Sequence, residues 1–341
     1  MGAYLIGHPE LEISFKESQA LGMLFVFNIL LFIFTIYSFY LIGPSTFPDY
    51  PGYVKLATFP EWSGSAHMTE YLSRFILESK FFGYSPEMRV NSLIFFVQVF
   101  ITIIFLFEAL KNPKMLYSAT IANSLYLPFF LTTGVRAASL YYIFFLFCAR
   151  KSNNKVVGIT DVLFISLLGS LFHDTFLIVT FGLLLSIFFN YLNLSKKLMA
   201  IILISSIPFV IIDDLSFVKT IIELISYDLG KFTAYMELNA YGLNKAIYLC
   251  LIILMCTYSI FVRDYAFSTN IVFSFALLII LSSFVNYVVS IRVSIFTLCS
   301  LFAFSSALNF KFENSFHNFI IFTLPICIAL YCFQLTSLIF Q

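Results

Sequence analysis

Long apolar segments separated by short polar breaks recur along the chain from residue 22 onward. A helix that crosses a lipid bilayer needs about 20 apolar residues, and most of these segments approach that length. Because apolar and polar residues do not alternate strictly, as they would in the strands of a barrel, the segments are predicted to be helices. Eleven spans are expected, at 22–42, 91–110, 115–132, 136–149, 157–172, 174–193, 198–212, 245–262, 270–290, 293–309 and 315–339.

Two longer polar segments interrupt this series, at 43–90 and 213–244. In the first, apolar residues recur at helical spacing over 67–82, which predicts a helix lying along a membrane surface. The second contains further helix-like stretches with aromatic residues. The pattern therefore predicts an all-α polytopic membrane protein of about eleven transmembrane helices, in one domain over 1–341, with two long external loops.

Composition agrees with this fold class and excludes several others. Hydrophobic residues make up 60% of the chain, charged residues 11%, and the mean hydropathy is +0.95, which excludes an ordinary soluble domain. A net charge of +1 does not indicate nucleic-acid binding. The six cysteines lie within apolar segments without metal-ligand spacing, so they are predicted to be packing residues. The sequence has no phosphate-binding glycine loop, zinc motif or nucleophile elbow, and no metal or other cofactor is expected.

The charged residues divide into two sets when the breaks are assigned alternately to the two sides of a membrane. The breaks at 111–114, 150–156, 194–197, 263–269 and 310–314 are small and basic. Positive charge favours the cytoplasmic side, which predicts a cytoplasmic N-terminus in the plasma membrane. Nearly all residues suited to chemistry fall in the other breaks, so the working face is expected to be extracytoplasmic.

Arg136 and Arg292 are candidates for binding an anion at that face. Arg136 follows Gly134 at the start of the fourth span, where a helix N-terminus and a guanidinium both favour phosphate. Arg292 lies at the outer end of the ninth span. Together with Arg136 it is a candidate for binding one anion from two sides. Each residue taken alone also suits an arginine that reaches lipid headgroups.

His173 is the first candidate for a general base, because a neutral imidazole can take a proton from a sugar hydroxyl. The alternative is a packed histidine. Asp174 follows it directly, but adjacent residues of a helix do not face each other, so Asp174 is expected to cap the next span or to contact substrate.

Further residues of the two outer loops are candidates for binding a sugar. Asp49, Tyr50 and Tyr53 combine a carboxylate with two aromatic rings, although a proline–glycine turn with interfacial tyrosines explains them equally well. Asp49 is also the second candidate for the base. Weaker candidates for substrate contact are Glu70, Lys231 and Tyr235.

The order of these motifs resembles that of the EpsG-like branch of the Wzy polysaccharide polymerases. The residues that carry the resemblance are Asp49-Tyr50-x-x-Tyr53, Thr69-Glu70-Tyr71-Leu72, Gly134-Val135-Arg136, Leu171-Phe172-His173 and Arg292. The resemblance implies a GT-C-like helical bundle in the bacterial inner membrane that joins oligosaccharide units carried on undecaprenyl pyrophosphate into O-antigen, capsule or exopolysaccharide. It implies an inverting transfer without a metal, with lipid-linked oligosaccharides as partners and a chain-length regulator as a candidate partner. Ala137 and Asp174 depart from the family pattern.

Other classes stay open at this point. A different lipid-linked-sugar glycosyltransferase, or an O-antigen ligase, would fit the same scaffold, and metal dependence through Asp49 would favour the former. A flippase or transporter needs charged residues along a path to both faces, which the one-sided charge pattern does not provide.

Overall fold

The computed structural model describes residues 15–47, 49–59, 71–113, 115–132, 135–151, 157–173, 175–211, 243–262, 266–283, 287–305 and 324–339. All regular structure within these ranges is helical, which confirms the prediction of an all-α fold. Each of the eleven expected spans has a long helix. They are α1 (Phe15–Ile42), α4 (Pro86–Lys111), α5 (Met115–Thr132), α6 (Val135–Lys151), α7 (Ile159–Ser170), α8 (Phe176–Leu192), α9 (Lys196–Ile211), α12 (Leu243–Val262), α13 (Ala266–Ser283), α14 (Tyr287–Ser305) and α16 (Leu324–Ile339).

Shorter helices form the described part of the first long polar segment. They are η1 (Pro44–Thr46), α2 (Tyr50–Thr58), α3 (Tyr71–Glu78) and η3 (Lys80–Phe82). The helix expected over 67–82 corresponds to α3 and η3. The proline–glycine turn considered for Asp49–Tyr53 is instead the start of α2, because Pro51 lies in the first turn, where its missing N–H costs nothing.

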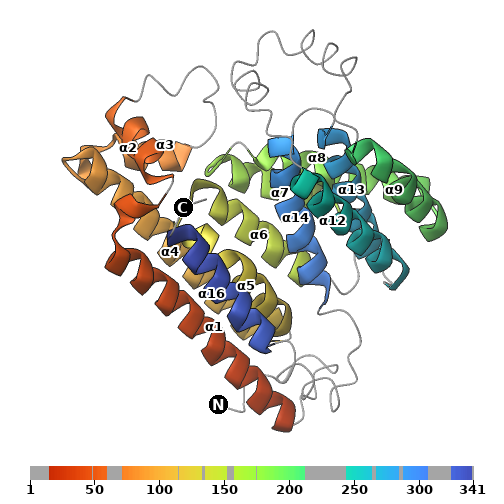
Figure 1. Ribbon diagram of the computed structural model, residues 1–341, viewed down its shortest axis with the longest axis horizontal. Helices are drawn as coiled ribbons and strands as arrows, with labels where there is room; N and C mark the ends of the chain where they lie inside the picture. Colours follow the sequence, from red (N-terminus) through yellow and green to blue (C-terminus); the bar gives the residue numbers. More distant parts are fainter. Residues whose placement is uncertain are drawn as a thin grey trace.

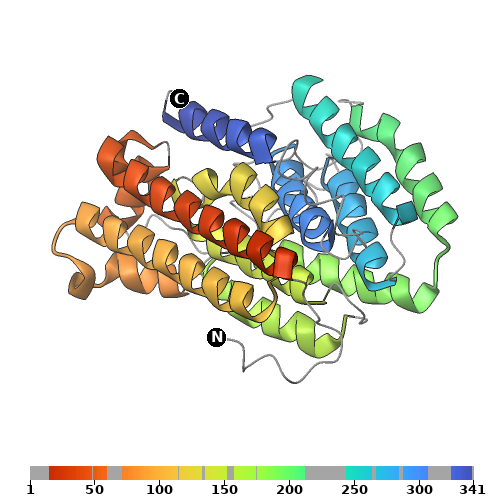
Figure 2. The ribbon, with the colours of Figure 1, turned by 90° about the horizontal axis from the view of Figure 1, so that it is seen from below.

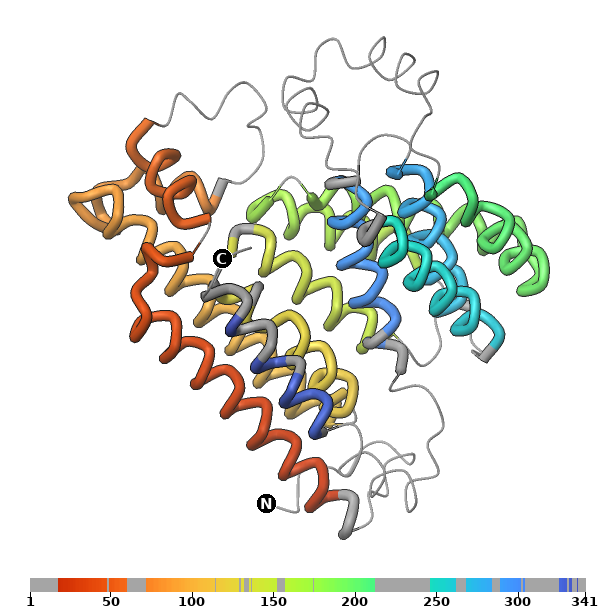
Figure 3. Tube along the Cα trace, viewed as in Figure 1, coloured from red at the N-terminus to blue at the C-terminus, as the bar shows by residue number. Residues whose placement is uncertain are grey.

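The helices pack back and forth as an antiparallel bundle (Figure 3). Helices α1, α4, α5 and α16 are grouped on one side, and α8, α9, α12 and α13 are grouped on the other (Figures 1 and 2). Between the two groups lie α6 and α14, which pack against each other. Helices α2 and α3 pack on the first turns of α4, beyond the ends of the neighbouring long helices (Figure 1).

Polar contacts identify the two ends of this bundle. At one end, Arg150 Nε lies 3.3 Å from Glu108 Oε1, and Lys151 Nζ lies 3.0 Å from Asp161 Oδ1, so the ends of α4, α6 and α7 meet there. The same end contains the α8–α9 turn with Lys196 and Lys197, because α8 is antiparallel to α7. We call it the basic end. The opposite end, with α2, α3 and the α7–α8 turn, is called the site end.

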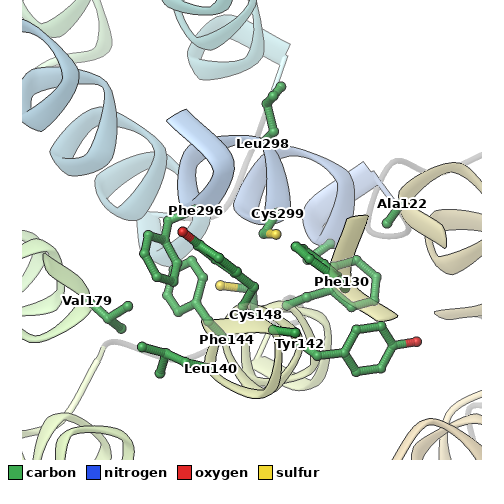
Figure 4. Close-up of a cluster of buried hydrophobic side chains, with 14 of the residues drawn as sticks. Ala122, Phe130, Leu140, Tyr142, Phe144, Cys148, Val179, Phe296, Leu298 and Cys299 are labelled. Atoms are coloured by element: carbon green, nitrogen blue, oxygen red, sulfur yellow. The ribbon is translucent and has the colours of Figure 1, made fainter. Parts of the chain in front are cut away.

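The interior of the bundle contains a hydrogen-bonded polar network. Asn28 Nδ2 donates to Thr120 Oγ1 at 2.9 Å, Asn123 Nδ2 donates to Asn28 Oδ1 at 2.7 Å, and the Tyr142 hydroxyl donates to Asn123 Oδ1 at 3.2 Å. These bonds join α1, α5 and α6. The six cysteines form no disulfide. Four of them are buried as packing residues, and of these Cys148 and Cys299 lie in the α6–α14 contact (Figure 4), whereas Cys250 is partly buried and Cys332 is exposed.

The outer surface of the bundle is unusually apolar. Large hydrophobic side chains are exposed along α1, α4, α7, α8, α9 and α12, and Leu167 on α7 is 72% exposed. Two described helices, Ser18–Ile42 and Pro86–Lys111, are long and apolar enough to cross a membrane, judged by length and composition alone. Five shorter apolar helices accompany them.

Candidate functional site

The first turns of α6 lie against the α7–α8 turn, and this contact brings Arg136 and His173 to the same level. A Cβ atom on Gly169 would lie 2.8 Å from both Leu140 Cδ1 and Phe176 Cβ, so the three helices meet closely at Gly169. Arg136 precedes Leu140 by one helical turn and shares its face. The His173 N–H donates to the Gly169 carbonyl at 3.1 Å, one turn beyond the same contact.

Arg292 is brought to this end by the packing of α14 on α6. The Phe296 ring lies 4.4 Å from the Tyr141 ring and 5.6 Å from the Phe144 ring, between centroids. Figure 4 shows Phe296 beside Phe144 in this contact. Arg292 precedes Phe296 by one turn, so its position is level with the first turn of α6, which contains Arg136. The positions predicted for the two arginines and the histidine therefore gather at the site end.

The local hydrogen bonds of His173 define what its ring can do. Its side chain is half-buried, and the Thr175 N–H donates to its Nδ1 at 3.1 Å. In the neutral ring the proton is then on Nε2, because Nδ1 uses its lone pair to accept this bond. An imidazole held in this way presents a donor at Nε2, not an acceptor. This geometry favours hydrogen bonding to an anion over removal of a proton.

Sequence reasoning missed several buried polar groups around this site. Gln98 Nε2 donates to the Leu131 carbonyl at 2.9 Å, which ties α4 to the end of α5. Among the described residues, Gln98 Oε1, Ser139 Oγ and Thr175 Oγ1 are buried and have no hydrogen-bond partner. Burying such atoms without partners is costly, and an internal water is the usual partner of such groups. Gln98 interrupts an apolar run, and that signal could have identified it.

The residues predicted to bind a sugar lie on α2. Asp49 is exposed at the start of this helix, whereas Tyr50 and Tyr53 are buried. The Tyr50 hydroxyl donates to Asn91 Oδ1 at 3.2 Å. Burial, with a smaller contribution from the negative charge of Glu87, raises the pKa of Tyr50 despite the opposing effect of the Asn91 bond. The two rings pack inside the protein, so Asp49 is the member of this group that is open to a sugar.

The residue after Asp49 contacts the outer part of α4. The Tyr50 contact is at Asn91 on α4, whereas the end of α5 is level with Gln98, seven residues along. Seven residues of helix correspond to about 10 Å. The Tyr50 contact is therefore farther out along α4 than the contact at the end of α5.

Four predicted contacts, Glu70, Asp174, Lys231 and Tyr235, lie outside the described residues. In the part of the chain that is described, no group of three or more His, Cys, Asp or Glu side chains is arranged to hold a metal ion. No protein-family model, curated protein or solved structure matches the chain. Its function is therefore inferred from the bundle and from the residues gathered at the site end.

Proposed function

We propose that the protein is an integral membrane glycosyltransferase that polymerises undecaprenyl-pyrophosphate-linked oligosaccharide units at the extracytoplasmic face, in the manner of the Wzy-type polymerases. The observation that supports this proposal is that the helix positions of Arg136, Arg292 and His173 lie at the end of the bundle opposite the basic end. Cations and a neutral donor gathered at one end suit a pyrophosphate leaving group.

The surface and interior of the bundle support its placement in a membrane. A soluble protein rarely exposes large contiguous apolar areas, whereas here they follow six long helices. Inside, the network of Asn28, Thr120, Asn123 and Tyr142 is the kind of polar contact that joins helices in lipid. With the basic end in the cytoplasm, all eleven long helices become transmembrane spans of a GT-C-like bundle, and α2 and α3 belong to an external loop.

The proposed reaction is a direct displacement. A hydroxyl oxygen of one lipid-linked unit attacks the anomeric carbon of the donor, and the bond from that carbon to the pyrophosphate oxygen breaks with its electron pair leaving on the pyrophosphate. Arg136 and Arg292 stabilise the charge that develops there, and His173 donates to it from Nε2. The donor is already activated, so no nucleotide enters, and the two arginines supply the charge that a metal would provide.

Asp49 is the better candidate to accept the proton of the attacking hydroxyl. In a displacement with inversion, the base lies on the opposite side of the anomeric carbon from the leaving group. Asp49 is exposed, and its neighbour Tyr50 contacts α4 about 10 Å outward of the contact between Gln98 and the end of α5. This assignment exchanges the two bases expected from the sequence, where His173 was the first choice.

The test is a polymerisation assay with purified protein and lipid-linked repeat units. Arg136→Ala, Arg292→Ala and His173→Ala should each lower the rate at least 100-fold, as removal of a charge-stabilising donor commonly does. Lys197→Ala, an exposed change at the basic end, is the matched control and should keep the wild-type rate. Wild-type rates in Arg136→Ala and Arg292→Ala together would refute the proposed role of the two arginines.

The same assay separates polymerisation from the neighbouring classes. A ladder of products identifies a polymerase, whereas a single transfer to lipid A core identifies a ligase. Loss of activity with a metal chelator, restored by a divalent cation, would instead support a metal-dependent transferase acting through Asp49.

A further inference from the structure

Helix α3 of the outer segment is hydrogen-bonded to the main chain that carries His173. The Leu72 N–H donates to the Leu171 carbonyl at 3.1 Å, and Ser73 Oγ donates to the Phe172 carbonyl at 3.2 Å. Ser73 is only 2% exposed, so this bond is shielded from water. The two acceptors are the residues immediately before the imidazole.

These carbonyls need partners because α7 ends at Ser170. Carbonyl groups in the last turn of a helix and just beyond it receive no hydrogen bond from within the helix, so they need N–H or O–H donors from other segments. Helix α3, almost 100 residues earlier in the chain, supplies two donors to this turn. The Phe172 ring also lies 5.2 Å from the Phe100 ring of α4, between centroids. The turn is thus fixed from outside the α7–α8 hairpin.

The other end of α3 is held by Arg89 of α4. Arg89 Nε donates to the Leu77 carbonyl at 2.6 Å, and Nη2 donates to the Ala57 carbonyl at 2.8 Å. One guanidinium therefore binds the last turns of both α3 and α2. Helix α3 is consequently attached at its first turn to the α7–α8 turn and at its last turn to α4.

We propose that α3 is a strap that positions His173, and that Ser73 is a positioning residue for this imidazole. The strap keeps the α7–α8 turn in the conformation in which the Thr175 N–H binds Nδ1, which leaves the proton of the neutral ring on Nε2. The catalytic consequence rests on the proposed function, but the attachment of the turn does not.

The experiment measures how fast diethyl pyrocarbonate modifies His173 in the full-length protein, with mass spectrometry of the peptide that contains it. Ser73→Ala should accelerate modification roughly 3- to 10-fold, because it removes one buried hydrogen bond from the turn. Ser92→Ala is the matched control, since Ser92 Oγ on α4 donates to the Phe82 carbonyl of the outer segment at 2.7 Å and not to a carbonyl of the turn. An unchanged rate in Ser73→Ala, or equal acceleration in both variants, would overturn the proposal.

A kinetic measurement then tests the consequence for catalysis. Ser73→Ala should lower kcat about 10-fold with little change in KM for the donor, because the imidazole is displaced while the arginines still bind pyrophosphate. A rise in KM alone would contradict the positioning role. If the wild-type protein polymerises nothing, the proposed function fails, yet the modification rates still decide whether α3 positions His173.

Discussion

At the scale of single residues, the largest cluster of hydrogen bonds in the described outer segment centres on Arg89. The side chain is buried, and besides Leu77 and Ala57 its Nη1 donates to the carbonyls of Gly83 and Tyr84 at 3.4 Å. A cation at the C-termini of two short helices also complements their dipoles. Arg89 therefore holds together the last turns of α2 and α3 and the loop that precedes α4.

Replacing this arginine should loosen the outer segment locally. Arg89→Met is expected to destabilise the α2–α3 region by about 2 kcal/mol or more, because it leaves buried carbonyl groups without donors. The measurement is the rate of tryptic cleavage at Lys55 and Lys80, two exposed residues of this segment. It should rise at least 10-fold.

The matched control for this change is Arg74→Met. The Arg74 Nε lies 3.4 Å from Glu78 Oε1 in a half-exposed ion pair on α3, which contributes little to stability. Cleavage at Lys55 and Lys80 should stay near the wild-type rate in this variant. Equal acceleration by both changes would show that Arg89 has no special role.

At the scale of secondary-structure elements, the approach of α6 to the α7–α8 hairpin depends on the missing side chain of Gly169. Gly169→Ala would place a methyl group 2.8 Å from Phe176 Cβ, which cannot move without its helix. The helices should separate at a cost of about 1–3 kcal/mol. Arg136 and His173 lie one turn beyond this contact. The polymerisation rate should therefore fall by more than the loss of folded protein accounts for.

This prediction is checked by comparing thermal unfolding and activity with those of Gly52→Ala. No atom lies within 4 Å of the Cβ position at Gly52, so the alanine is accommodated there. If Gly169→Ala left both the melting temperature and the activity unchanged, the close contact at Gly169 would not determine the geometry of the site.

The elements also show what the sequence could and could not predict. The long helices were predictable because each corresponds to a continuous apolar segment, and such segments are easy to recognise in the sequence. Helix α2 was missed because Pro51 and Gly52 indicate a turn equally well. The roles of Ser73 and Arg89 could not be predicted from the hydrophobic pattern. Both side chains donate to main-chain carbonyls, which every residue carries, so their partners leave no signal in the sequence.

For the whole molecule, the separation of the basic end from the site end is the feature on which orientation depends. The ion pairs of Glu108 with Arg150 and of Asp161 with Lys151 bring the last turns of α4 and α6 to the first turn of α7, which defines the basic end. The placement of Arg136, His173 and Arg292 at one end was predictable, because consecutive antiparallel helices put every second break on the same side. The contacts between elements were not, since the Tyr50–Asn91 and Gln98–Leu131 bonds depend on packing that the pattern does not encode.

Labelling of single cysteines tests this orientation. In a variant without the native cysteines, Thr46→Cys at the site end and Lys197→Cys at the basic end each introduce one exposed thiol. If the proposed orientation holds, a membrane-impermeant maleimide should label residue 46 in intact cells and residue 197 only after permeabilisation, because positively charged loops favour the cytoplasmic side. Labelling does not depend on activity, so it tests orientation separately from chemistry. If both thiols reacted under the same condition, the two ends would not face opposite compartments, and Arg136, Arg292 and His173 could not be assigned to the extracytoplasmic side, as the proposed function requires.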